Sequence, residues 1–188
     1  MSEFKITKTS FRDLLILETF PFKDERGTFS KLFCYSSMQD VIQKRQIKQI
    51  NYSYTRKIGT VRGFHFQYPP FSEFKLVTCL KGKIFDVVID LRKGSPTFLK
   101  NHSMILDEGD NLALCIPEGF AHGFQSLSKN SEILYFHTEK YMPKAEGNIY
   151  PLDSKVGVEW PLECAEISDK DLKAPSLDIS NFKGLETS

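Results

Sequence analysis

The sequence predicts an all-β fold, a sandwich or barrel built from short strands. Sixteen Phe, seven Tyr and one Trp make 13% of the 188 residues aromatic. Short apolar or β-branched segments recur at a spacing of roughly 8–12 residues, with Gly, Pro, Asn or charged clusters between them. Little helical periodicity separates these segments. Together these features are typical of a β-sandwich or closed barrel rather than of alternating strands and helices.

Six segments are predicted strands because each is four to seven residues long, apolar or β-branched, and bounded by turn residues. They are 13–18, 76–80, 84–90, 103–106, 112–116 and 132–137. Turn signals between them lie at 81–82, 93–96, 108–110 and 128–130. Residues 38–45 are predicted to form a short helix. A looser helical turn is expected after Ser168, whose hydroxyl can cap residues 169–172.

The length and charge limit the domain count and the partners. A chain of 188 residues is expected to form one domain over 1–188. Its 25 Lys and Arg against 24 Asp and Glu give a net charge of +1, so neither nucleic acid nor a membrane surface is an expected partner. No basic-then-apolar leader opens the sequence, which predicts a cytoplasmic location. The polar, Pro-interrupted tail 174–188 is expected to pack on the surface and fray at its end.

The four cysteines carry no motif. Cys34, Cys79, Cys115 and Cys164 are scattered without CxxC spacing, and Cys79 and Cys115 lie inside apolar runs. A core of this size does not need disulfides. The four are therefore predicted to be small buried hydrophobic residues.

Two of the four histidines stand in unusual contexts. His65 lies within 59–67 and His122 within 116–124, and both stretches are rich in Gly and Phe. In a small barrel, a strand face that carries Gly, His and Gln is a polar pocket lining. Each histidine alone is compatible with a structural or a catalytic role. Strand alternation puts Gly63, His65 and Gln67 on one face and Arg62, Phe64 and Phe66 on the other.

The stretch from Pro117 to His122 is the Pro-x-Gly-x-x-His element of cupin barrels. Metal-binding cupins add His-x-His and then a Glu from an earlier strand. Here that strand has Gln67 in place of the second His, and the nearest acid, Glu73, lies beyond a Tyr-Pro-Pro break. A divalent site needs about three good nitrogen or oxygen ligands. We therefore expect a barrel without a metal, and a metal-dependent cupin oxygenase is the alternative.

Further stretches match one enzyme family in order and spacing. They are 24–29, 49–53, 61–67, 75–77, 82–92, 95–98, 116–124, 134–135, 141–143, 159–161 and 168–171. Each is weak alone, but their combination is highly specific. Through most of its length the sequence resembles the dTDP-4-dehydrorhamnose 3,5-epimerase family. The resemblance implies a cupin-like jelly-roll β-barrel with short peripheral helices.

The chemistry of this family explains the residue types. In a nucleotide-linked 4-keto-6-deoxyhexose, the hydrogens on C3 and C5 lie next to the ketone and can be removed as an enolate forms. Inversion needs a base on one face, a proton donor on the other and positive charge near the oxyanion. The resemblance implies that His65 is the base, oriented by Asp171, that Tyr135 is the acid and that Lys75 lies near the C4 oxygen. No cofactor is required.

The resemblance also implies residues that bind the substrate. Guanidinium groups suit a diphosphate. The matching positions are Arg26, Phe29, Gln49, Asn51, Arg62, His122, Tyr141 and Glu146. His122 and Asp86 match a second buried pair, for which pocket tuning and mutual hydrogen bonding are both open. Members of the family form homodimers that exchange N-terminal strands, so Arg26 and Phe29 are candidates for a partner's pocket. A plain charged turn at 24–27 is the alternative.

Three positions depart from the family pattern. Lys31 replaces a Glu, Lys140 replaces an aromatic residue at the base site, and Phe136 replaces a Lys after the acid. The leading hypothesis is an epimerase acting on dTDP-4-dehydro-6-deoxyglucose. A CDP- or GDP-sugar, inversion of C3 or C5 alone, a 3,4-ketoisomerase and a silent sugar-nucleotide binding module are the alternatives that the sequence leaves open.

Overall fold

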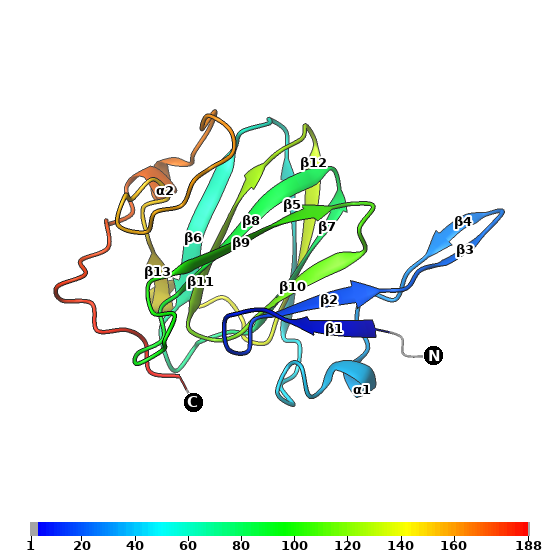
Figure 1. The fold of residues 1–188 in the computed structure, drawn as a ribbon, viewed down its shortest axis with the longest axis horizontal. Helices are drawn as coiled ribbons and strands as arrows, with labels where there is room; N and C mark the ends of the chain where they lie inside the picture. Colours follow the sequence, from blue (N-terminus) through cyan, green and yellow to red (C-terminus); the bar gives the residue numbers. More distant parts are fainter. Residues whose placement is uncertain (1–3, 188) are drawn as a thin grey trace.

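Two antiparallel β-sheets that face each other make up the computed structural model, which describes residues 4–187 (Figure 1). This arrangement confirms the predicted all-β, cupin-like class. The six-stranded sheet has the order β1 (Phe4–Lys8), β2 (Leu15–Thr19), β10 (Leu112–Ile116), β7 (Lys75–Lys81), β12 (Ser131–His137) and β5 (Gln49–Thr55). The five-stranded sheet has the order β13 (Glu146–Asn148), β6 (Val61–Gln67), β11 (Phe120–Ser126), β8 (Lys83–Asp90) and β9 (Asn101–Asp107).

All six predicted strands are present, with ends that differ by a few residues from those expected. The prediction for 112–116 coincides with β10, and 132–137 differs from β12 by one residue. These segments are well predicted because their apolar residues face a shared core, which enforces the alternation.

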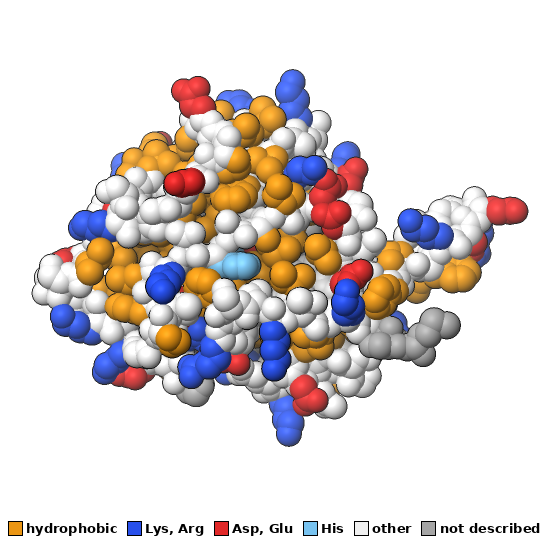
Figure 2. Space-filling model, viewed as in Figure 1, with side chains coloured by type: hydrophobic (Ala, Val, Ile, Leu, Met, Phe, Trp, Pro, Cys, Tyr) orange, Lys and Arg blue, Asp and Glu red, His pale blue; other side chains and the backbone are white. Residues whose placement is uncertain are grey.

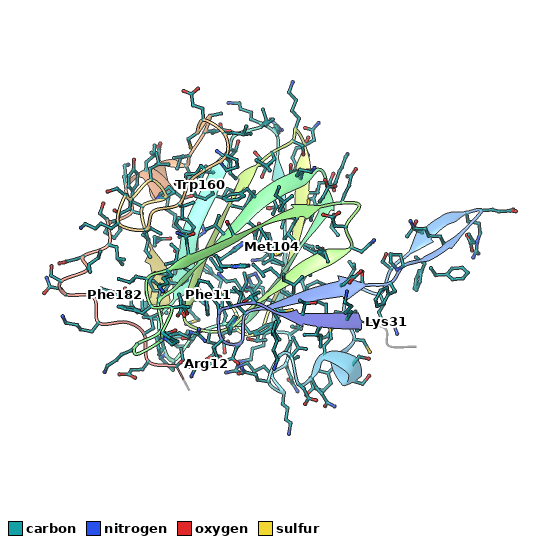
Figure 3. The ribbon with its side chains drawn as sticks, in the orientation of Figure 1. Phe11, Arg12, Lys31, Met104, Trp160 and Phe182 are labelled. Atoms are coloured by element: carbon teal, nitrogen blue, oxygen red, sulfur yellow. The ribbon has the colours of Figure 1, made fainter. Side chains whose placement is uncertain are left out.

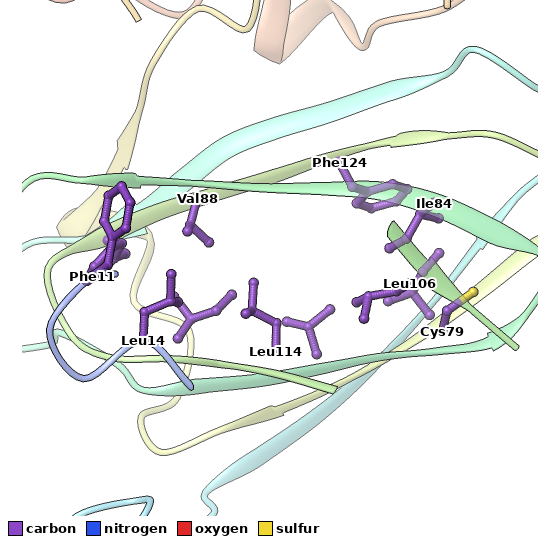
Figure 4. Close-up of a cluster of buried hydrophobic side chains, with 12 residues drawn as sticks. Phe11, Leu14, Cys79, Ile84, Val88, Leu106, Leu114 and Phe124 are labelled. Atoms are coloured by element: carbon purple, nitrogen blue, oxygen red, sulfur yellow. The ribbon is translucent and has the colours of Figure 1, made fainter. Parts of the chain in front are cut away.

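One apolar cluster fills part of the space between the sheets (Figure 4). Alternate residues of each strand point into it, such as Val77 and Cys79 from β7 and Ile84 and Val88 from β8. Phe124 from β11 lies near Ile84 in the same layer. Because this packing fills one end of the barrel, the other end is left for polar side chains.

Two further clusters cover the outer faces of the sheets. Residues from 32–47 pack with Leu76 and Phe136 on the six-stranded sheet. On the five-stranded sheet, Phe64 stacks on Trp160 with ring centroids 5.6 Å apart. Leu177 and Leu185 of the C-terminal segment are buried in this second cluster. The C-terminal segment therefore lies against the sheet that carries His65.

The predicted helix at 38–45 is wrong. The helix α1 spans Tyr35–Met38 and is followed by turns. Gln43 and Lys44 have φ of 54° and 60°, a left-handed conformation that a helix does not accommodate. Val41 and Ile42 are buried against the six-stranded sheet. Their apolar spacing therefore reflects contact with the sheet rather than a helical repeat.

The cysteine prediction holds for two of the four residues. Cys79 and Cys115 are buried, and burial raises the pKa of each thiol to about 12. Cys34 and Cys164 are partly exposed, and all four are free thiols. Within residues 4–187, no helix is long and apolar enough to cross a membrane.

A hairpin of β3 (Phe22–Asp24) and β4 (Gly27–Phe29) projects away from the two sheets (Figure 1). Its apolar side chains are open to solvent (Figure 2). Phe22 and Phe29 are 63% and 74% exposed. Such exposure is unusual for Phe side chains that lie close together on a surface.

Candidate active site

A cavity of about 910 Å³ opens between the two sheets at the end of the barrel that the apolar core leaves free. Strands β5, β6, β7, β11 and β12 provide its walls, and helix α2 (Asp169–Leu172) closes one side. Ten of the twelve residues of the predicted site line it. They are Gln49, Asn51, Arg62, His65, Lys75, His122, Tyr135, Tyr141, Glu146 and, from α2, Asp171.

The imidazole of His65 and the carboxylate of Asp171 form the central pair. Nε2 of His65 lies 2.7 Å from Oδ1 of Asp171. An ionised carboxylate can only accept a hydrogen bond, so Nε2–H is the donor. The Nδ1 lone pair of His65 is then available as a base, because Asp171 is the only hydrogen-bond partner of this ring among residues 4–187.

Local structure fixes Asp171 in this position. The Ser168 hydroxyl accepts a hydrogen bond from the Asp171 N–H at 3.1 Å, which caps α2 as predicted. Oδ2 of Asp171 accepts the Gly63 N–H at 3.2 Å. Burial raises the pKa of Asp171, but the hydrogen bond and charge of His65 and the Gly63 N–H outweigh it, so the net pKa lies below its usual value.

A β-bulge in β6 brings Arg62 to the cavity side. His122 pairs with His65, but Phe124 pairs with Arg62, so two steps along β11 match three steps along β6. The extra residue reverses the alternation of side chains. The prediction that Arg62 faces away from His65 is therefore wrong. Phe64 and Phe66 are in the outer cluster as expected.

Gly63 makes this bulge possible. Its φ is 121°, a conformation that favours glycine, and a Cβ atom there would lie 2.6 Å from the Gly123 Cα. The backbones of β6 and β11 can therefore approach closely only while this position has no side chain. The glycine sets the place of His65 two residues later.

Lys75 is a buried cation beside His65. Its side chain is 9% exposed, and Nζ donates to Oε1 of Glu73 at 3.0 Å and to the His65 carbonyl oxygen at 3.4 Å. A buried ammonium near a cavity wall is suited to a developing negative charge. Lys75 and His65 line the same cavity.

The phenol of Tyr135 is held on the opposite sheet from His65. Its oxygen lies 3.1 Å from the Ser53 hydroxyl on the neighbouring strand β5. Burial raises the pKa of Tyr135, and the hydrogen bond to Ser53 lowers it by less, so the phenol stays protonated well above neutral pH. A protonated phenol that faces a cavity is a competent proton donor.

His122 and Asp86 form the second buried pair. Nε2 of His122 lies 2.7 Å from Oδ1 of Asp86, and the Asp86 side chain is fully buried. The His122 ring lies 6.2 Å from the Tyr135 ring in an edge-on arrangement. Oδ2 of Asp86 has no hydrogen-bond partner within residues 4–187.

The open end of the cavity has a polar rim. Oε2 of Glu146 accepts the Tyr141 hydroxyl at 2.9 Å, and Oε1 pairs with Lys170 at 2.5 Å. Burial raises the pKa of Glu146, but Lys170 and Tyr141 lower it further, so the carboxylate is charged. Gln49 and Asn51 lie side by side on β5, with Gln49 Nε2 3.0 Å from Asn51 Oδ1.

Two predicted residues lie outside the cavity of their own chain. Arg26 and Phe29 are on the exposed β3–β4 hairpin, where Arg26 pairs with Asp24. None of the three family departures lines the cavity either. Lys31 lies on the side from which the hairpin extends (Figure 3), Phe136 stacks on Phe33 in the outer cluster, and Lys140 is exposed.

Sequence reasoning did not assign four residues that belong to the site. Ser53, His137 and Lys170 line the cavity, and so does Glu73, which the sequence suggests only as a possible metal ligand. One signal was present, because His137 follows Tyr135 by two residues and shares its strand face. Within residues 4–187, no three His, Cys, Asp or Glu side chains are grouped as metal ligands.

A cupin-like barrel with an imidazole–carboxylate pair, a buried ammonium and a phenol in one cavity defines a class of acid–base site. The chain belongs to the dTDP-4-dehydrorhamnose 3,5-epimerase family, whose profile matches residues 8–178.

Relatives of this family cover nearly the whole chain. The dTDP-4-dehydrorhamnose 3,5-epimerase of Salmonella typhimurium is 42% identical over 92% of this chain and 95% of its own. The crystal structure of a dTDP-6-deoxy-D-glucose-3,5-epimerase from Legionella pneumophila, in complex with dTDP-4-keto-L-rhamnose, has a TM-score of 0.91 and 34% identity over 98% of both chains. The crystal structure of dTDP-4-dehydrorhamnose 3,5-epimerase from Bacillus anthracis, with TDP and pyrophosphate bound, is also similar. It has a TM-score of 0.89 and 34% identity over 93% of this chain and 99% of that one.

Proposed function

We propose that the protein inverts C3 and C5 of dTDP-4-dehydro-6-deoxyglucose through an enolate and without a cofactor. One observation carries this proposal: the His65–Asp171 pair shares a cavity with the Tyr135 phenol on the opposite sheet. Inversion requires a base and an acid on two sides of one carbon. A site for binding alone needs neither. Membership of the epimerase family supports the same chemistry.

His65 removes the proton. Its Nδ1 lone pair takes the hydrogen on C3 or C5, and the electrons of the broken C–H bond form the C=C bond of the enolate. The carbonyl electrons move onto the C4 oxygen, where the charge of Lys75 stabilises the oxyanion. Asp171 holds the ring in the Nε2–H tautomer and stabilises the imidazolium that results.

Tyr135 returns a proton to the opposite face of the same carbon. The phenolic O–H bond breaks, and its proton is transferred to the enolate carbon. The C=C electrons form the new C–H bond, and the electrons on the C4 oxygen restore the carbonyl. The phenolate then regains a proton from solvent, and His65 releases its own. A second round at the other carbon completes the inversion.

The nucleotide is bound by the outer part of the cavity. Arg62 exposes a guanidinium group there, which fits diphosphate oxygens. Gln49, Asn51, Tyr141 and Glu146 offer hydrogen-bond donors, acceptors and one aromatic face to the sugar and base. His122 lines the inner wall next to Tyr135.

The test is incubation with dTDP-4-dehydro-6-deoxyglucose in deuterated water, followed by NMR. We expect deuterium at both C3 and C5. Label at one carbon would overturn the double inversion and identify a mono-epimerase. A carbonyl moved to C3 would identify a 3,4-ketoisomerase. No label would reject this substrate, and CDP- and GDP-linked sugars would be tried next. Stoichiometric iron or manganese in the purified protein would favour an oxygenase instead.

The homodimer is also part of the proposal. Phe22 and Phe29 are exposed on the projecting hairpin, and the edge strand β5 exposes Ile50, Tyr52 and Tyr54. Edge strands and apolar hairpins of this kind are sites for a second chain. A second copy that receives the hairpin would bring Arg26 and Phe29 to the partner's cavity.

Subunit mixing tests this arrangement. Arg26→Ala and His65→Ala variants are each expected to have low activity. If Arg26 serves the partner's cavity, a mixed dimer contains one cavity with neither substitution, so mixing restores part of the activity. No restoration on mixing, with subunit exchange verified by mass spectrometry, would place Arg26 in its own chain's cavity or outside the site.

A further inference from the structure

Glu73 and His137 line the cavity wall between Lys75 and Asn51. Nδ1 of His137 lies 2.8 Å from Oε2 of Glu73, and Nε2 lies 3.3 Å from Nδ2 of Asn51. Both side chains are about nine-tenths buried. The His137 ring also stacks on the Tyr135 ring, with centroids 6.1 Å apart and an interplanar angle of 25°. His137 therefore contacts the proposed acid directly.

The direction of this hydrogen-bond chain is fixed at its outer end. The backbone N–H of Tyr141 can only donate, and it lies 2.9 Å from Oε1 of Gln49. Gln49 must then turn Nε2 toward Asn51, whose Oδ1 accepts it at 3.0 Å. Asn51 therefore turns its Nδ2 donor toward His137, and Nε2 of His137 must be the acceptor.

The series of hydrogen bonds continues from His137 through Glu73 to Lys75. With Nε2 as an acceptor, the neutral His137 ring carries its proton on Nδ1 and donates to Oε2 of Glu73. Oε1 of Glu73 accepts Lys75 Nζ at 3.0 Å. Burial raises the pKa of Glu73, but the charge of Lys75 and the hydrogen bond from His137 lower it further, so the carboxylate is charged.

These contacts leave one N–H donor of the Lys75 ammonium available for a ligand. An ammonium has three N–H donors. Among residues 4–187, Nζ of Lys75 meets two acceptors, Glu73 and the His65 carbonyl oxygen. Because Oε2 of Glu73 is occupied by His137, the carboxylate cannot rotate with the lysine, and the third N–H has a fixed direction.

We propose that Glu73 and His137 are positioning residues of the active site, which fix Lys75 for the enolate oxygen and link it to the segment that carries Tyr141. The inference rests on the proposed function for the role of Lys75. Glu73 and His137 act through Lys75, Asn51 and Tyr135 rather than on the substrate itself.

The first test needs only the substrate-free wild-type protein. Long-range ¹H–¹⁵N NMR distinguishes the two neutral tautomers of a histidine, and the His137 signals are assigned by their loss in His137→Asn. At a pH where the ring is neutral, we expect the Nδ1–H tautomer. An Nε2–H tautomer, or an average of the two, would overturn the hydrogen-bond chain even if the protein is an active epimerase.

The second test measures kcat and KM of variants in the epimerase reaction. His137→Leu removes the donor to Glu73, and we expect kcat to fall by about 10- to 100-fold, because a small misplacement of a reacting group has effects of that size. KM should change much less. His137→Asn can still donate to Glu73 through Nδ2 and should recover most of the loss. Glu73→Gln should also lower kcat.

Phe136→Leu is the matched control, because it lies on the same strand and its side chain is buried on the opposite face. Its kcat should stay near the wild-type value. Equal kcat values for His137→Leu and Phe136→Leu, or no recovery in His137→Asn, would overturn the positioning role. A wild-type protein that incorporates no deuterium would instead reject the proposed function, while the tautomer still tests the chain.

Discussion

His65 and Asp171 are 106 residues apart in the sequence, and their side chains meet at 2.7 Å. His65 lies on the inner strand β6 of the five-stranded sheet, while Asp171 comes from a one-turn helix near the C-terminus. The pair joins two parts of the fold that pack on each other through Phe64, Trp160 and Leu177. A change that loosens the C-terminal segment should therefore affect catalysis at His65.

Asp171→Asn should lower kcat on dTDP-4-dehydro-6-deoxyglucose by about 100-fold, since general acid–base groups contribute 10²–10⁴-fold. Asparagine has nearly the same volume but cannot stabilise the imidazolium. KM should change little. Steady-state kinetics and thermal unfolding check this, and wild-type kcat in a folded Asp171→Asn protein would contradict the role.

Ser168→Ala separates the helix cap from the chemistry. Loss of the hydroxyl that accepts the Asp171 N–H should lower the free energy of unfolding by about 1 kcal/mol. The carboxylate keeps its bonds to His65 and to the Gly63 N–H, so kcat should fall less than in Asp171→Asn. Denaturant unfolding and kinetics on the two variants together measure this; an equal loss of kcat would mean that the cap controls the geometry.

The sequence predicted what depends on regular alternation and missed what depends on local irregularity. Strands such as β10 and β12 follow from their apolar pattern because both contribute to the core. Arg62 was assigned to the wrong face because the bulge next to Gly63 is not visible in a residue pattern. The roles proposed for Glu73 and His137 depend on contacts across strands, which spacing along one strand does not specify.

The shifted pKa of Asp171 affects stability at low pH, and the shifted pKa of Tyr135 affects activity at high pH. The pKa of Asp171 is lowered, so its contribution to stability is present above the unfolded pKa, near 3.8, and is lost as pH falls through the folded pKa. The pKa of Tyr135 is raised above 10.0, chiefly by burial, so the proton donor persists to higher pH. The alkaline loss of activity due to Tyr135 should therefore lie above pH 10.

Ultraviolet difference titration measures the phenol directly. The absorbance of wild-type protein minus that of Tyr135→Phe should show no phenolate from this residue up to pH 10. Phenolate absorbance from Tyr135 below that pH would show that the cavity stabilises the anion, and the assignment of a protonated donor would fail.

Gly63→Ala should damage both stability and activity. The new Cβ would lie 2.6 Å from the Gly123 Cα, and φ is 121°. The strands must separate or the bulge must change, at a cost of about 2 kcal/mol. Because His65 follows the bulge, kcat should fall as well. Gly109→Ala is the control, since its nearest atom is 4.0 Å away and its φ is ordinary. Similar unfolding free energies for the two variants would contradict the close approach.

His122→Leu tests the second buried pair. The substitution leaves the fully buried Asp86 carboxylate without its imidazole partner, and breaking a buried pair in this way should cost about 3 kcal/mol. The double variant Asp86→Val, His122→Leu removes both polar groups, so it should be more stable than His122→Leu alone. The two effects are therefore expected to be non-additive, because the residues share one hydrogen bond.

Chemical denaturation of the wild type, both single variants and the double variant gives the coupling energy. If the changes in unfolding free energy of the two single variants add up to that of the double variant, Asp86 is hydrogen-bonded to another group. The pair would then have no structural role.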